Sequence, residues 1–155
     1  MKMVGHGIDR QRLVFPGLAD LYGRLAPYSY AFMRFATGAV LVPHGVQKVF
    51  YLSIDRYAET IAQHGLPLAR PLAYLTFFTE FVGAACLAIG LFTRVAALMI
   101  LIQMIVIIFV FNWQAGYFWT NRGIEYALLW ALLCLAIFFR GGGRYSLDHL
   151  LGKEF

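Results

Sequence analysis

Apolar residues follow one another along the chain in four long stretches, separated by shorter polar segments. We place the stretches at residues 28–51, 71–92, 95–113 and 124–139. A transmembrane helix needs about 20 predominantly apolar residues, which the first three stretches supply. The fourth has 16 residues and is expected to lie in thinned bilayer or to recruit flanking residues. The pattern predicts an all-α fold, an integral membrane four-helix bundle.

Short amphipathic segments flank the predicted spans. Four apolar residues repeat at helical spacing after Pro16, as in a helix that lies on the membrane surface: Leu18, Leu21, Tyr22 and Leu25. Residues 53–65 predict a second interfacial helix, capped by Ser53 and ended by Gly65. We therefore divide the chain into an N-terminal segment (1–27) with an interfacial helix, a membrane domain (28–140) and a C-terminal tail (141–155).

Composition supports lipid as the solvent. Of the 155 residues, 61% are hydrophobic and 14% are charged, whereas soluble domains average about 45–50% and about 25%. The net charge is +5, but the basic residues sit at the ends of the apolar stretches rather than in one patch. This distribution is typical of membrane orientation and argues against a nucleic-acid partner.

The basic residues also predict the orientation of the bundle. With four spans, eight basic residues fall on the side of the termini and three on the other: Lys2, Arg10, Arg12, Arg24, Arg94, Arg140, Arg144 and Lys153 against Arg56, Arg70 and Arg122. The positive-inside rule then places both termini in the cytoplasm. Residues 1–20 contain no apolar core and no cleavage site, so we expect insertion to rely on the internal stretches.

Motifs for common cofactors are missing from the sequence. Cys86 and Cys134 lie inside apolar stretches and form no C-x-x-C pair, so neither a zinc site nor a redox dithiol is indicated. The four histidines are scattered, which predicts no metal site. The sequence also lacks a P-loop, a haem-attachment motif and a Rossmann glycine pattern that would bind a flavin.

Charged residues inside the predicted spans are the main candidates for chemistry. A charge at mid-bilayer costs roughly 2.5–3.5 kcal/mol, so such groups should face the bundle interior and pair. Lys48 lies near the outer end of the first span, and Glu80 lies nine residues into the second. At 1.5 Å per residue Glu80 is about 13 Å deep, level with His44 and one turn below Lys48.

Depth therefore predicts one polar cluster in the outer half of the bundle. Its members are His44, Lys48, Glu80 and Glu125, with Gln103 and Asn112 as neighbours. On the opposite side, Arg34 is expected to pair with Asp148, with Arg94 competing for that carboxylate. All of these charges could equally be structural ion pairs that fix helix register without chemistry.

Six short motifs occur in a fixed order: HGVQK at 44–48, HGLP at 64–67, Glu80 inside a span, GLFTR at 90–94, GIEY at 123–126 and YSLD at 145–148. In this order and spacing the chain resembles the DoxX/DoxD family, from about residue 28 to residue 148. The resemblance implies a four-helix bundle of the bacterial inner membrane. It also implies that the polar positions of the family are His44, Lys48, Glu80, Arg94, Glu125 and Asp148 here.

The resemblance further implies a function. The relatives that name the family are subunits of thiosulfate:quinone oxidoreductase, and others are linked to complexes with superoxide dismutase and a sulfurtransferase. We therefore expect a quinone-linked oxidoreductase subunit that uses ubiquinone or menaquinone. Because the chain has no flavin, haem or dithiol motif, its electrons must come from the substrate or from a partner chain.

Two other function classes stay open, and with them the question of whether the protein is an enzyme. In the first, the ion pairs only hold the bundle, and the chain is a scaffold or assembly factor that recruits soluble redox enzymes. In the second, the chain transports a small solute, which would require a homo-oligomer because four short helices enclose little volume.

Overall fold

The computed structural model describes residues 3–4 and 8–153 and is built almost entirely from helices. The elements are β1 (Met3–Val4), β2 (Ile8–Asp9), η1 (Arg10–Arg12), η2 (Pro16–Leu18), α1 (Ala19–Phe50), α2 (Ile54–Gln63), α3 (Ala69–Phe78), η3 (Thr79–Gly83), α4 (Ala84–Ile89), α5 (Thr93–Val106), η4 (Ile107–Asn112), η5 (Trp113–Ala115), η6 (Trp119–Asn121), α6 (Glu125–Arg140) and α7 (Leu147–Leu150). The two short strands pair antiparallel. The all-α prediction is confirmed.

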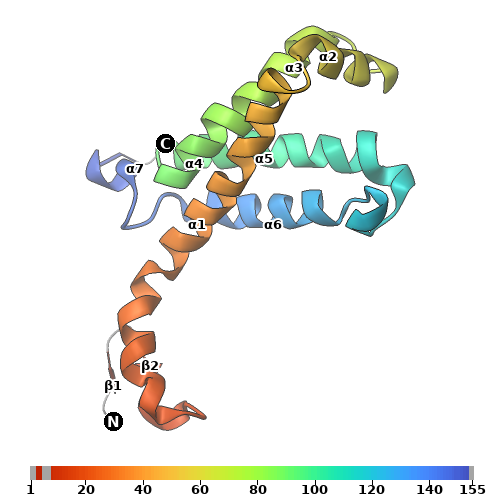
Figure 1. The fold of residues 1–155 in the computed structure, drawn as a ribbon. Coiled ribbons are helices and arrows are strands. Elements are labelled where there is room, and N and C mark those ends of the chain that lie inside the picture. The colour runs from red at the N-terminus through yellow and green to blue at the C-terminus, as the bar shows by residue number, and fades with distance from the viewer. Residues whose placement is uncertain (1–2, 5–7, 154–155) are drawn as a thin grey trace.

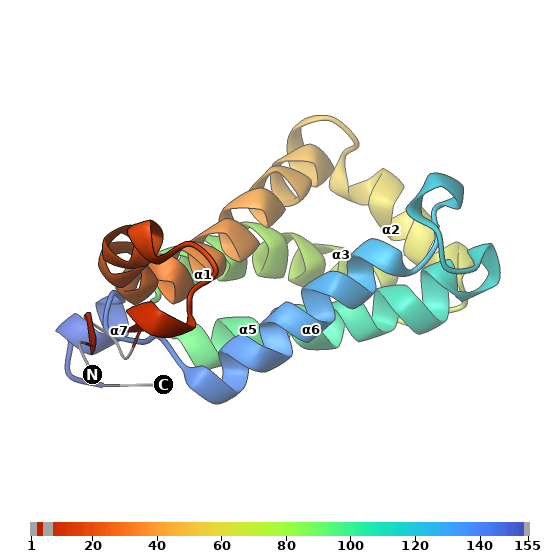
Figure 2. The same ribbon diagram turned by 90° about the horizontal axis from the view of Figure 1, so that it is seen from below.

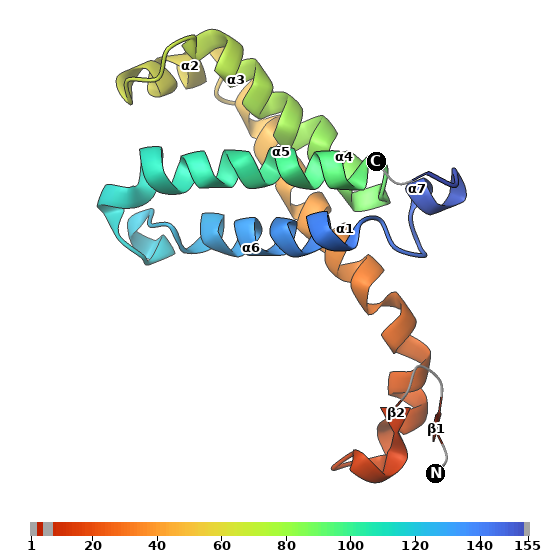
Figure 3. The same ribbon diagram turned by 180° about the vertical axis from the view of Figure 1, so that it is seen from behind.

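Four helical rods form the body of the molecule. The rods are α1, the continuous run α3–η3–α4, the run α5–η4, and α6. The first two rods pack against each other, and the last two form a hairpin that crosses them (Figures 1 and 3). Seen from below, α2 and the α5–α6 connection lie at one end, and α7 and the beginning of α1 lie at the other (Figure 2). We call these the connection end and the terminal end.

Two rods of the described chain are long and apolar enough to cross a membrane. They are Ala69–Ile89, with a mean hydropathy of 1.8, and Thr93–Ala115, with a mean hydropathy of 2.7. They correspond to the second and third predicted stretches. Helices also occupy the first and fourth stretches, but α6 has only 16 residues and α1 carries charges along its length.

The N-terminal segment differs from the prediction. Residues 19–27 do not form a separate interfacial helix, because they are the beginning of α1, which runs for 32 residues through Pro27. This first part of α1 projects away from the other rods (Figure 1). The second amphipathic segment is found as predicted, in α2, where the Ser53 hydroxyl accepts from the Arg56 backbone N–H and Gly65 follows the helix with φ +76°.

Small residues let the rods approach closely. Gly38 and Gly45 belong to the buried stripe of α1. A Cβ on Gly38 would lie 2.4 Å from the carbonyl oxygen of Ala84, and one on Gly45 would lie 2.9 Å from the backbone nitrogen of Phe81. Because only glycine leaves room for this contact, the two positions bring α1 directly against η3 and α4.

Candidate functional site

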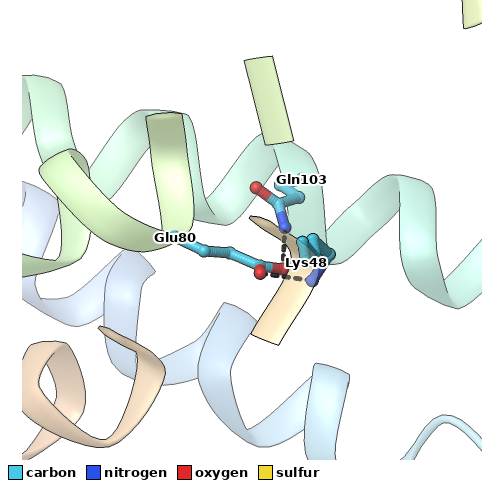
Figure 4. A network of polar contacts seen from close by, with 3 residues as sticks. All are labelled: Lys48, Glu80 and Gln103. Carbon is cyan, nitrogen blue, oxygen red and sulfur yellow. Dashed lines mark hydrogen bonds and ion pairs between the residues drawn. The ribbon is translucent and has the colours of Figure 1, made fainter. Parts of the chain in front are cut away.

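Three side chains from three rods meet inside the bundle. Lys48 of α1 forms an ion pair with Oε2 of Glu80, and Nε2 of Gln103 in α5 donates to Oε1 of Glu80 at 2.6 Å. Figure 4 shows the carboxylate pointing at both donors. The Glu80 side chain is 3% exposed and that of Lys48 is 12% exposed. Both oxygens of a buried carboxylate are therefore matched, one by a charge and one by an amide.

The backbone around Glu80 positions its side chain toward Lys48 and Gln103. Glu80 lies in η3, a π-helical turn between α3 and α4. Such turns occur frequently at functional sites, because the extra residue shifts the side chains that follow. Gly45 packs on the backbone of this turn, with a virtual Cβ 3.0 Å from the carbonyl carbon of Glu80. The close approach at Gly45 sets the distance that Lys48, almost one turn later, has to bridge.

An apolar cavity of about 290 Å³ adjoins the network. Its wall comes from α2, α3, η3, α5 and η4, and Gln103 belongs to it. The remaining lining residues are mostly aliphatic or aromatic: Tyr57, Ile61, Leu66, Leu72, Leu75, Thr76, Thr79, Met99, Ile102, Val106, Ile107 and Phe111. Pockets for small organic ligands begin at about 300 Å³ and combine apolar walls with a few polar groups, and this cavity fits that description.

The Gln103 amide has one free acceptor. Its Nε2 is engaged by Glu80, while Oε1 is buried and accepts no hydrogen bond from the described residues. A buried acceptor without a donor costs about 1–3 kcal/mol. The amide thus offers an oxygen to a group that donates a hydrogen bond.

Tyr57 contributes a phenol group to the cavity wall. Burial, together with the negative charge of Glu80, raises the pKa of Tyr57 to about 12. The phenol is therefore protonated at every physiological pH. Its ring centroid lies 5.0 Å from Lys48 Nζ, so the same side chain shields the ammonium group.

Two of the residues predicted for the outer cluster lie elsewhere. His44 is exposed on α1 and makes no polar contact with the described residues. It is one residue before Gly45, and a step of about 100° turns its side chain away from the buried stripe. Glu125 begins α6, where its Oε2 accepts from the backbone N–H of Trp119 at 3.1 Å. Glu125 therefore holds the loop before α6 and does not join Lys48.

Of the two residues predicted as neighbours of the cluster, only Gln103 contacts it in the structure. Gln103 is a full member of the network, whereas Nδ2 of Asn112 donates to the carbonyl of Gly123 at 3.3 Å. Tyr57 and the cavity were not predicted. The amphipathic pattern of 53–65 placed Tyr57 on an apolar face, but nothing in the sequence indicates that α2 covers the end of the α3–α5 interface.

The structural ion pairs predicted at the terminal end are replaced by backbone contacts. The Asp148 carboxylate is fully buried and accepts from the backbone N–H groups of Phe92 and Thr93, at 2.8 and 2.9 Å, and from the Thr93 hydroxyl at 2.6 Å. It therefore caps the N-terminus of α5. Arg34 instead donates to the carbonyl of Tyr145 at 2.8 Å, so the predicted Arg34–Asp148 pair is not formed.

Arg94 likewise binds the end of a helix. Its Nη1 donates to the carbonyls of Phe138 and Phe139, at 2.7 and 2.9 Å, in the last turn of α6. A cation at a helix C-terminus is favourable because the last carbonyls lack partners. In the described part of the chain, no three His, Cys, Asp or Glu side chains are grouped as metal ligands would be.

Comparison with known proteins gives two relatives and one family. An uncharacterized protein of Haemophilus influenzae is 32% identical over 132 residues, which cover 83% of this chain and 94% of the relative. An uncharacterized membrane protein of Mycobacterium tuberculosis is 29% identical over 141 residues, covering 83% and 84%. No solved structure matches significantly. The model of the DoxX family matches residues 29–113, which include Lys48, Glu80 and Gln103. The chain belongs to the DoxX family of membrane proteins.

Proposed function

We propose that this protein is a quinone-binding subunit of an inner-membrane oxidoreductase, and that the quinone ring binds in the cavity beside Gln103. The observation that carries the proposal is the position of Gln103. It lies in the wall of an apolar cavity and binds the buried ion pair, and its buried Oε1 has no donor among the described residues. A hydroxylated aromatic ring would fill the apolar volume and donate to that oxygen.

The proposal includes an arrangement in the membrane. All four rods span the bilayer, α1 by its C-terminal part, and both termini lie in the cytoplasm, as the basic residues predict. The connection end, with the cavity, then lies in the outer half of the bundle. The aromatic residues of the loop before α6, among them Trp113 and Trp119, are exposed, as expected at a lipid–water interface.

The chain's own residues supply the polar and proton-carrying groups. Reduction of a quinone to a quinol takes up two electrons and two protons, and the electrons come from a partner subunit that oxidises a small anion such as thiosulfate to tetrathionate. Oε1 of Gln103 would accept from a hydroxyl of the reduced quinol. Tyr57 keeps its proton and would donate to a carbonyl of the oxidised quinone. Glu80 and Lys48 hold a proton beside the cavity, and Lys48, the more exposed of the two, exchanges it with the outside.

Binding of the reduced, quinol form of a short-chain ubiquinone or menaquinone analogue to the purified protein in detergent tests the proposal. We expect saturable binding with one site per chain, weakened at least tenfold in Gln103→Leu. Val106→Phe should also abolish binding, because the larger ring occupies the cavity without touching the ion pair. Gln114→Leu is the matched control, since Gln114 is exposed in η5. Binding that does not saturate, or that is equal in all four proteins, overturns the proposal.

A scaffold function is the second candidate. It is favoured by the matching of Glu80, because both of its oxygens already have protein donors and the ion pair needs no ligand to be stable. In that case a stoichiometric soluble partner should be captured by crosslinking in native membranes, with yields unchanged in Gln103→Leu, while the quinone analogue does not bind.

A further inference from the structure

A second concave site lies at the terminal end, far along the chain from Gln103. It is a groove of about 870 Å³ between the middle of α1 and the end of α6. Its lining includes apolar residues, among them Pro27, Met33 and Phe139. Tyr30, Tyr145 and two arginines, Arg140 and Arg144, also line the groove.

The two arginines are held in place by aromatic rings rather than by carboxylates. The Cζ of Arg140 lies 4.3 Å from the ring centroid of Tyr30, and that of Arg144 lies 5.8 Å from the ring centroid of Tyr145. Neither guanidinium has an ion-pair partner within the described residues. Both are exposed, so their donor groups are available to a ligand. A guanidinium stacked on a ring loses little freedom when it binds an anion in its plane.

The three glycines between the arginines bring them to the same groove. Gly141 and Gly143 have φ of +78° and +70°, which side-chain-bearing residues rarely adopt. A Cβ on Gly143 would lie 2.9 Å from Cε1 of Tyr30, so the chain passes directly over the ring that carries Arg140. The hydroxyl of Tyr30 donates to the carbonyl of Gly141 and fixes the turn. The sequence RGGGR is thus folded around Tyr30.

We propose that this groove binds the head group of an anionic phospholipid. The two guanidinium groups in the groove lining can donate to a phosphodiester, which accepts charge-assisted hydrogen bonds from arginine. The apolar lining residues Pro27, Met33 and Phe139 match the start of an acyl chain. A free phosphate would leave these apolar residues uncovered. The inference does not depend on quinone binding, because the two sites share no residue.

Lipid titration of the delipidated protein in detergent tests the inference. We expect short-chain phosphatidylglycerol to bind saturably, at least tenfold more tightly than phosphatidylcholine of the same chain length, and inorganic phosphate not to compete at millimolar concentration. In Arg140→Gln/Arg144→Gln the affinity for phosphatidylglycerol should fall at least tenfold. Arg56→Gln/Arg122→Gln removes the same charge at the connection end and should bind as the wild type does.

Three results overturn the inference. The first is equal affinity for the two lipids, and the second is an equal loss of affinity in both double variants, which would indicate diffuse charge attraction. The third is competition by inorganic phosphate, which would assign the groove to a free anion. The variant Arg140→Lys/Arg144→Lys keeps both positive charges, so it tests the inference even if the glutamine variant does not fold. The lysine variant should still bind phosphatidylglycerol more tightly than phosphatidylcholine.

Discussion

At the scale of single residues, the buried carboxylate of Glu80 depends most strongly on its neighbours for stability. A carboxylate removed from solvent loses several kcal/mol of hydration, which is recovered only when a counter-charge and donors are in place. Lys48 provides the charge and Gln103 the donor, from two different rods. Each of the three residues therefore depends on the other two, and the site exists only when three helices are assembled.

Removing the charges one at a time and together measures this dependence. We expect Lys48→Met to destabilise the protein by about 3–5 kcal/mol, because the carboxylate of Glu80 is left buried without a counter-charge. Lys48→Met/Glu80→Gln should lose much less, about 1 kcal/mol, since no charge is then buried. Reversible unfolding in mixed micelles gives the values for Lys48→Met, Glu80→Gln and the double variant. Additive effects of the two substitutions would contradict a tightly coupled pair.

At the scale of elements, glycines and backbone caps determine how the rods meet. The buried stripe of α1 contains Gly38 and Gly45, and each touches the backbone of the neighbouring rod. At the terminal end the turn between α4 and α5 is closed by Asp148, which lies more than 50 residues later in the chain. Each of these contacts has backbone atoms on at least one side, and backbone atoms shift less easily than the ends of flexible side chains.

A methyl group at the first of these contacts should separate the rods. We expect Gly38→Ala to cost about 1–3 kcal/mol, because the new Cβ meets the carbonyl of Ala84 at 2.4 Å and that oxygen cannot turn away. Gly17→Ala is the control, since nothing lies within 4 Å of its virtual Cβ. Thermal unfolding followed by circular dichroism compares the two. Equal melting temperatures for Gly38→Ala and the wild type would show that the contact is not rigid.

The cap on α5 can be weakened without changing its shape. Asp148→Asn keeps one oxygen as an acceptor but replaces the other with an NH₂ group, which faces the N–H and hydroxyl donors of the turn. The change should lower the free energy of unfolding by about 1–3 kcal/mol. Asp55→Asn is a matched change, because Asp55 pairs with Arg70 at the surface, where both side chains are more than 65% exposed. Its cost should be below about 1 kcal/mol. If the two variants unfold at the same temperature, Asp148 does not act as a cap.

At the scale of the whole molecule, the bundle has two chemically different ends. The connection end contains the cavity, the interior ion pair and the exposed tryptophans, and the terminal end contains the RGGGR groove and the capped α4–α5 turn. The proposed orientation places the first outside and the second in the cytoplasm. The two proposed ligands, a quinone and an anionic lipid, would then bind near opposite faces of the membrane.

Cysteine labelling tests the orientation. In a Cys86→Ala/Cys134→Ala background, we expect Thr120→Cys in the loop before α6 to react with an impermeant maleimide added to spheroplasts. Lys153→Cys should react only after the membrane is opened. Both positions are exposed, so accessibility depends on the side of the membrane alone. Labelling of Lys153→Cys in intact spheroplasts would place the termini outside.

Much of this architecture follows from the order of apolar and polar residues. The lengths of the apolar stretches located the helices of the second, third and fourth rods to within a few residues, and the depths of Lys48 and Glu80 in adjacent antiparallel helices predicted their contact. These features depend on distances along a helix, which are fixed by the rise per residue.

Features that depend on competition between contacts were not predictable in the same way. Asp148 had a guanidinium and a helix N-terminus within reach, and the three donors of the Phe92–Thr93 turn bind its carboxylate. His44 was misplaced because helical phase, unlike depth, changes by about 100° with each residue. The continuity of α1 through Pro27 was missed because a single proline only removes one hydrogen bond and does not always end a helix.

The uninterrupted helix α1 is longer than the hydrocarbon core of a bilayer is thick. Its 32 residues measure about 48 Å, and the hydrocarbon core of a bilayer measures about 30 Å. In the proposed arrangement, in which the C-terminal part of α1 crosses the bilayer, roughly one third of the helix would extend beyond the lipid tails. Because α1 is continuous over these 32 residues, a partner bound to that extension in the proposed arrangement would be connected to Lys48 through a single helix.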